Sequence, residues 1–190
     1  RSFQDTWKDD YEQMHNDSYP YSLMIETRAM ANVPSLPDEA FMSSFADNVD
    51  CLRFQLVSVK PLGGFVKSHS DTWAKVGGIL EDDEDFGGQL NRKLNNEEAI
   101  INKAKALKTN DEKIAYVFNE VRNTMKWNDI DRWYTIDGTY RAWENKTGNS
   151  AEINIILYHL LKKSGIDAYP MVVSTQKHGR VVPFYTSLAQ

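Results

Sequence analysis

Ser150 occupies a position where a reactive side chain would gain most from its surroundings. Asn149 and Glu152 have the spacing of a capping box, and an apolar periodic stretch follows as far as Gly165, so Ser150 is predicted to lie in the first turn of a helix. The unpaired N–H groups at a helix start carry partial positive charge, which stabilises the anion of a nucleophile and can bind an oxyanion. The chemistry suited to this position is acyl transfer, with a base supplied from a neighbouring strand.

A hydroxyl at this position changes what the site can do. The pKa of a serine hydroxyl is far above that of a thiol, so a site that stabilises a thiolate does not by itself produce an alkoxide. A serine nucleophile therefore needs a good base. We interpret Ser150 as a helix-start residue at the position of a lost nucleophile, and we keep a serine nucleophile as the alternative.

The histidines are scattered along the chain, and none stands out as that base. His159 is expected inside the helix and His178 in a turn. Since no two of the four stand at the spacing of metal ligands, neither a metal site nor a cofactor is expected. The other two are His15 and His69.

The helix that carries Ser150 is predicted to run to about Lys163. Its apolar face consists of residues three and four positions apart, namely Ile153, Ile156, Leu157, Leu160 and Leu161. Gly165 can end it, and Ala168–Thr175 is then predicted to be a buried sheet strand. If the strand that should follow is missing, an open edge remains, and such edges recruit other chains. We therefore expect a homodimer through an exposed strand edge.

The secondary structure predicted before this helix changes from strands to helices near Asp71. Strands are predicted earlier, at Tyr21–Ala29 and at Leu52–Leu56. After Asp71 the pattern is helical, and the pairs Gly77-Gly78 and Gly87-Gly88 are expected to break the first helical stretch. Two further helix starts are predicted from capping-box spacing, Asn95 with Glu98 and Thr109 with Glu112.

A long loop before Asn149 is rich in aromatic residues. Loops of this length tend to be functional or to pack against a cleft. Aromatic side chains bury a large area at low entropic cost, so they could bind a peptide or a sugar, although core packing is the competing interpretation. The candidate binding residues are Trp127, Trp133, Tyr134, Tyr140 and Trp143.

The stretch KTGNSAEINIILYHLLKKSGIDAYPMVVST resembles the core of bacterial transglutaminase-like proteins. The family's nucleophilic Cys stands where this chain has Ser150, and the other motif places are occupied by Gly148, Glu152, Gly165, Ile166 and Ala168. The upstream stretch DEKIAYVFNEVRNTMKW resembles the helix that precedes this core. The stretch VPSLPDEAFMSSFADNVDCLRFQLVS resembles the end of a β-rich domain that often comes before it.

This resemblance implies an α+β fold with a papain-like transglutaminase core, in which the helix carrying the nucleophile position packs on an antiparallel sheet. It implies three parts: residues 1–70 as the end of a β-rich N-terminal domain, 71–94 as a helical linker, and 95–190 as the core, incomplete at its C-terminus. The family's His and Asp are expected on strands that would follow Gln190. The familiar triad therefore has no recognisable member in this chain.

The resemblance leads us to expect a non-catalytic binding or scaffold module in a bacterial envelope protein, located in the periplasm or cell envelope. One alternative is an active enzyme of the thiol protease or transglutaminase class, or a serine variant, whose remaining groups lie beyond Gln190. Another is a carbohydrate-binding module that uses the aromatic loop. The partner would be a peptide, a protein or a glycan.

The amino-acid composition narrows the possible classes of protein and partner. Hydrophobic residues make up 41% of the chain and charged residues 26%, which suits a packed core. The net charge of −5 argues against nucleic acid as the partner, because phosphate binding relies on clustered Lys and Arg. No stretch approaches the roughly 18 apolar residues of a membrane span.

Overall fold

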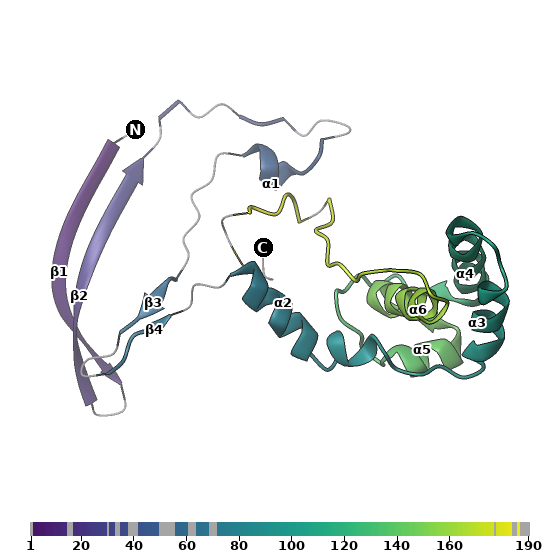
Figure 1. Ribbon diagram of the computed structural model, residues 1–190. Coiled ribbons are helices and arrows are strands. Elements are labelled where there is room, and N and C mark those ends of the chain that lie inside the picture. The colour runs from purple at the N-terminus through teal and green to yellow at the C-terminus, as the bar shows by residue number, and fades with distance from the viewer. Residues whose placement is uncertain are drawn as a thin grey trace. The chain divides into compact units, whose positions relative to one another are not determined.

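The computed structural model of the 190-residue chain describes residues 2–14, 17–29, 31–32, 35–37, 42–49, 56–60, 64–68, 72–176, 178–183 and 186 (Figure 1). Helices and sheets both occur, so the predicted α+β class is confirmed at that level. The chain divides into two units. The first consists of Arg1–Asp71 with Ser174–Gln190, and the second of Thr72–Val173.

The first unit is built on paired strands. β1 (Ser2–Met14) pairs antiparallel with β2 (Asp17–Ala29), which contains the predicted strand Tyr21–Ala29 and confirms it. The other elements are a single helical turn, α1 (Phe45–Asn48), and a short antiparallel pair, β3 (Ser58–Val59) with β4 (Lys67–Ser68). The predicted strand Leu52–Leu56 falls, except for Leu56, outside the described residues.

The second unit is mainly helical. In chain order its elements are α2 (Trp73–Asp82), the 3-10 turn η1 (Gly87–Gln89), α3 (Glu97–Lys105), α4 (Asn110–Thr124), β5 (Lys126–Trp127), α5 (Thr139–Asn145), β6 (Thr147–Gly148) and α6 (Ser150–Lys163). The stretch 71–94, expected as a linker, contributes α2 and η1 to this unit. β5 and β6 form a two-residue parallel pair, whereas the core was expected to hold an antiparallel sheet.

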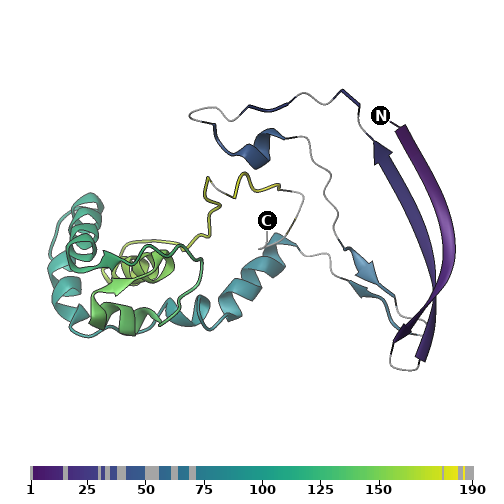
Figure 2. The same cartoon turned by 180° about the vertical axis from the view of Figure 1, so that it is seen from behind.

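The core of this unit is centred on α6, which packs against α3, α4 and α5 (Figures 1 and 2). Ile156 and Leu160 of α6 are fully buried, and Ile153, Leu157 and Leu161 pack at the edge of the same cluster. The predicted helix to Lys163 and its apolar face are therefore confirmed. The remaining core residues come from the other helices and the segments beside them: Leu94, Ile101, Ala104, Val117, Val121, Met125, Ala142 and Trp143.

α2 runs without a break through Gly77 and Gly78, so the predicted interruption there is wrong. A helical glycine costs only about 0.5–1 kcal/mol relative to alanine, and neighbouring helix-forming residues can offset that amount. A Cβ added at either glycine would meet no atom within 4 Å. The pair thus weakens α2 without ending it.

Replacing Gly78 by alanine should raise the free energy of unfolding by about 0.5–1 kcal/mol, since the new methyl group has space and the unfolded chain loses freedom. Gly148→Ala is the matched control. A Cβ there would lie 2.9 Å from Glu152 Oε2 and 3.1 Å from Ala142 Cβ, so this variant should be less stable. Urea unfolding of both variants checks the prediction, which fails if the two changes have the same sign.

One of the two predicted capping boxes is confirmed and the other is wrong. Thr109 and Glu112 form the box at the start of α4, and the backbone N–H groups of Thr109 and Lys108 lower the pKa of Glu112. α3 instead begins one residue later than expected, after Asn96, whose side chain makes no cap. Glu98 pairs with Lys93 at 3.2 Å. Glu97, the first residue of α3, is buried and makes the contacts described below.

The predicted strand Ala168–Thr175 is also wrong, because these residues are irregular. A strand needs a hydrogen-bonded neighbour, and none of the described strands pairs with this stretch. Val172 packs on the small cluster of Phe86, Ala151 and Ile155, whereas Met171 is 80% exposed. The strand edge expected to join two copies of the chain is therefore not formed there.

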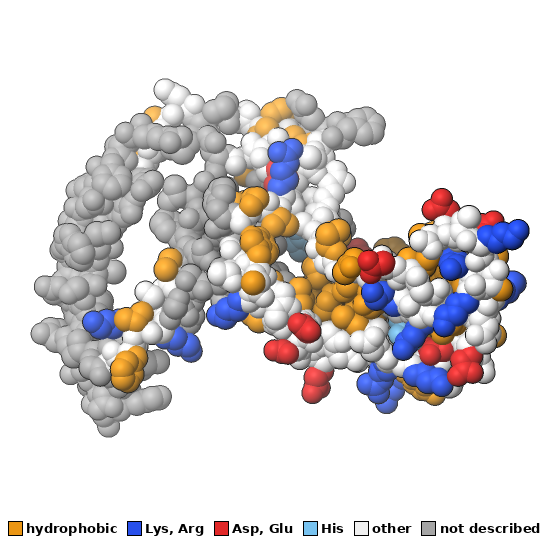
Figure 3. Space-filling view, viewed as in Figure 1, with side chains coloured by type: hydrophobic (Ala, Val, Ile, Leu, Met, Phe, Trp, Pro, Cys, Tyr) orange, Lys and Arg blue, Asp and Glu red, His pale blue; other side chains and the backbone are white. Residues whose placement is uncertain are grey.

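Acidic and basic side chains are interspersed on the visible face of the helical unit (Figure 3). Interspersed charges of both signs produce no strong single-sign field at long range. Any electrostatic selectivity for a ligand on this face must then come from individual charged side chains that contact the ligand directly.

Candidate functional site

The start of α6 is shaped by reciprocal capping, as predicted. Asn149 precedes the helix in an extended conformation, and its Oδ1 accepts the backbone N–H of Glu152 at 2.8 Å. The Glu152 carboxylate accepts the backbone N–H of Asn149 through Oε2, also at 2.8 Å. Both side chains are buried. Ser150 is accordingly the first residue of the helix, as predicted.

The Ser150 hydroxyl is hydrogen-bonded to the backbone of the preceding loop. It accepts the N–H of Arg132 at 3.0 Å and donates to the carbonyl oxygen of Arg132, also at 3.0 Å. The Ser150 backbone N–H donates to the carbonyl oxygen of Ile130 at 3.1 Å. Ser150 thus attaches the loop to α6 through three hydrogen bonds to the loop backbone.

Glu152 extends this fastening further along the loop. Its Oε1 accepts the backbone N–H groups of Ile136 at 2.9 Å and of Asp137 at 2.8 Å. With the contact to Asn149, the buried carboxylate accepts three backbone N–H groups. Asn149 Nδ2 also donates to the carbonyl oxygen of Tyr134 at 3.0 Å. The first turn of α6 is thereby surrounded by backbone atoms of residues 130–137.

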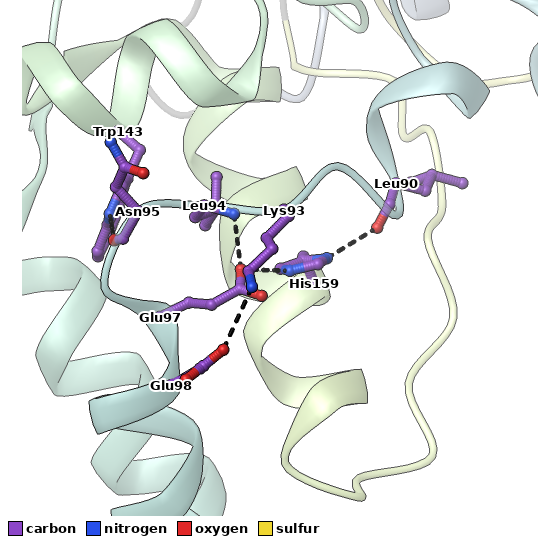
Figure 4. Close-up of polar contacts among 8 residues, drawn as sticks. All are labelled: Leu90, Lys93, Leu94, Asn95, Glu97, Glu98, Trp143 and His159. Atoms are coloured by element: carbon purple, nitrogen blue, oxygen red, sulfur yellow. Dashed lines mark hydrogen bonds and ion pairs between the residues drawn. The ribbon is translucent and has the colours of Figure 1, made fainter.

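A buried contact between a histidine and a glutamate lies further along α6 (Figure 4). His159 Nε2 lies 2.8 Å from Glu97 Oε2, and both side chains are at least nine-tenths buried. His159 Nδ1 lies 3.3 Å from the carbonyl oxygen of Leu90, and the N–H of Leu94 donates to Glu97 Oε2 at 2.7 Å. Since both neighbours of the ring are acceptors, an imidazole with N–H on both nitrogens satisfies both contacts.

His159 does not complete a catalytic pair with Ser150. The two residues are nine positions apart on one helix, which is about 14 Å along the axis at 1.5 Å per residue. Both ring nitrogens are already engaged. The sequence predicted that His159 lies in the helix, but Glu97 was not predicted as its partner. The one indication in the sequence was that His159 lies one turn from Ile156 on the apolar face, where a buried polar side chain needs a partner.

The five aromatic candidates have different environments. Trp143 is in the core, where its Nε1–H donates to the carbonyl oxygen of Asn95 at 2.9 Å. Trp133 packs edge-on against Tyr134, with ring centroids 5.1 Å apart. Trp127 and Tyr140 are the more exposed two, at 51% and 39%. The structure thus places these residues partly in the core and partly at the surface.

Among the described residues, no three His, Cys, Asp or Glu side chains are grouped as metal ligands would be. No helix in the described part of the chain is long and apolar enough to span a bilayer. No known protein-family model, curated protein or solved structure matches this chain.

Proposed function

We propose that the second unit is a transglutaminase-like core of the papain-like type that has lost its catalytic chemistry and serves as a non-catalytic binding or scaffold module in a bacterial envelope protein. The observation that carries this proposal is the two-way hydrogen bonding between the Ser150 hydroxyl and the backbone of Arg132. A nucleophile has to present its oxygen to a substrate, whereas this oxygen holds a loop in place.

The surroundings of Ser150 support the same conclusion. Acyl transfer requires a base next to the nucleophile and free N–H groups for the oxyanion. In the second unit the one histidine, His159, is engaged with Glu97, and the N–H of Ser150 is engaged with Ile130. Neither His159 nor the N–H of Ser150 is thus free to take part in acyl transfer.

The assignment to the transglutaminase-like group rests on the resemblance of the sequence, and the local arrangement supports it. Ser150 begins a helix, and that helix packs on α4, whose sequence resembles the upstream helix of the family. Gly148 is buried against Glu152 and Ala142, which explains why the motif has glycine at this place.

The test compares the full chain with Ser150→Cys. We expect neither protein to incorporate an amine into a glutamine peptide or to cleave a peptide, because restoring one member of a catalytic unit recovers little. The thiol at position 150 should nonetheless react with iodoacetamide about tenfold faster than a thiol introduced by Lys163→Cys at the other end of α6, because a helix start favours the thiolate. Both variants carry Cys51→Ser so that only the new thiol reacts.

Turnover by the original chain, abolished in Ser150→Ala, would overturn this proposal and identify a serine enzyme. Turnover by Ser150→Cys alone would instead show that a base reaches the site. Equal alkylation rates at positions 150 and 163 would show that the helix start no longer favours an anion.

A further inference from the structure

A small pocket on the second unit is lined by charged side chains of both signs. Its volume is about 230 Å³. One wall comes from the segment around η1, and the other from the residues that lead into α5. The lining includes Asp85, Gln89 and Arg92 from the first wall and Asp137, Tyr140 and Arg141 from the second.

The two walls are held together by buried hydrogen bonds. Gln89 is 7% exposed, and its Oε1 accepts both the backbone N–H and the hydroxyl of Thr139, at 3.1 and 3.2 Å. Its Nε2 donates to the carbonyl oxygen of Glu84 at 3.0 Å, and the N–H of Thr135 donates to the carbonyl oxygen of Asp85 at 2.8 Å. The pocket is therefore formed before any ligand binds, which lowers the entropic cost of binding.

Each wall contributes one carboxylate and one guanidinium. The first wall has Asp85 and Arg92, and the second has Asp137 and Arg141. With the residues that the structure describes, these four side chains form no ion pair and no hydrogen bond, even though they share one small pocket. The fixed walls thus present opposite charges that do not neutralise each other directly.

We propose that this pocket binds a small zwitterion, namely a free amino acid or a short peptide with both ends free. Its carboxylate would contact the guanidinium groups of Arg92 and Arg141, which bind carboxylates with paired N–H groups. Its ammonium group would contact the carboxylates of Asp85 and Asp137. The Tyr140 hydroxyl accepts Asn95 Nδ2 at 2.9 Å and keeps its own proton for the ligand.

The size and charge balance of the pocket favour this ligand class over others. The volume is below the roughly 300–1,000 Å³ of clefts for drug-sized ligands, which suits a small molecule or the end of a chain. A simple anion would be attracted by the arginines but repelled by the two carboxylates. A simple cation would be attracted by the carboxylates but repelled by the two guanidinium groups. This site does not depend on Ser150, and it stands whether or not the unit is transglutaminase-like.

The test is a titration of the ¹⁵N-labelled full chain with alanyl-alanine, followed by NMR at the amide of Gly138, which also lines the pocket. Alanine is a second probe, and it tells a free amino acid from a peptide end. N-acetyl-alanyl-alanine and alanyl-alanine amide each lack one terminal charge and should bind about tenfold more weakly or worse. Arg92→Met, Arg141→Met, Asp85→Asn and Asp137→Asn should each weaken dipeptide binding about tenfold, while Arg122→Met and Asp111→Asn on α4 should leave it unchanged.

The pocket variants should unfold at the same temperature as the original chain, because their charged groups form no ion pair or hydrogen bond with the described residues. Equal affinity for the dipeptide and its blocked forms would overturn the proposal, as would displacement of the dipeptide by glucose or by inorganic phosphate. An absence of shifts up to about 50 mM dipeptide would overturn it too, since that is weaker than the millimolar binding of about −4 kcal/mol expected for such contacts. None of these outcomes bears on the tests at position 150.

Discussion

His159→Leu should lower the free energy of unfolding by about 3–5 kcal/mol, one of the largest effects expected of any single change in this chain. The substitution removes the hydrogen-bonded partner of Glu97 and leaves its carboxyl group buried, with the N–H of Leu94 as its remaining donor among the described residues. A buried charge without its partner is far costlier than a lost hydrogen bond between neutral groups. Urea unfolding followed by tryptophan fluorescence measures the loss.

The reverse change should be milder. In Glu97→Gln the amide oxygen can still accept the N–H of Leu94, and the amide NH₂ can donate to a neutral His159 ring whose other nitrogen donates to Leu90. We expect a loss of about 1–2 kcal/mol. The double variant should then be more stable than His159→Leu alone, because no carboxylate is left at position 97. Equal losses in the two single variants would show that the contact is no ion pair.

Glu152→Ala should cost about 3–5 kcal/mol, because it leaves three backbone N–H groups without their acceptor. The cost stays near the lower end of about 1–3 kcal/mol for each group, because Ile136 and Asp137 lie at the surface, where water can replace part of the loss. Glu152→Gln should cost less, about 1–3 kcal/mol, since one amide oxygen can still accept part of the set while its NH₂ faces a donor. Hydrogen exchange should accelerate at the amides of Ile136, Asp137 and Asn149 in both variants.

Glu144→Gln is the matched control for Glu152. This carboxylate is exposed on α5 and forms no hydrogen bond with the described residues of the loop. Its replacement should change the free energy of unfolding by less than about 0.5 kcal/mol. If Glu152→Ala were equally harmless, the loop would have to be held by contacts other than the backbone hydrogen bonds described here.

α6 could be predicted from the sequence because everything that defines it is local. The Asn149–Glu152 box, the apolar spacing around Ile156 and the end near Lys163 all lie within 15 residues. The β-strand predicted at Ala168–Thr175 failed for the opposite reason. Apolar content indicates that a strand could form, but only a partner strand elsewhere in the fold supplies its hydrogen bonds.

In the candidate site, too, the features that depend on local sequence could be predicted and those that depend on distant residues could not. The place of Ser150 at the helix start followed from local spacing, whereas its engagement with Arg132 involves backbone atoms that every residue type carries, so no sequence pattern could reveal it. The pair of His159 and Glu97 joins residues 62 positions apart, and α3 does not begin at the predicted box. The opposed charges of the pocket likewise depend on the meeting of two segments far apart in the sequence.

The loop at residues 130–137 is attached through its main chain, and this has a consequence for how the protein can change. Ile130, Arg132, Tyr134 and Asp137 reach the start of α6 through N–H or carbonyl groups, while the side chains of Ile130, Arg132 and Asp137 are exposed. Mutations at these positions can alter the chemistry displayed to a partner while the anchoring bonds persist. The exposed side chains of this loop can therefore diverge in sequence without loss of the hydrogen bonds that attach its main chain to α6.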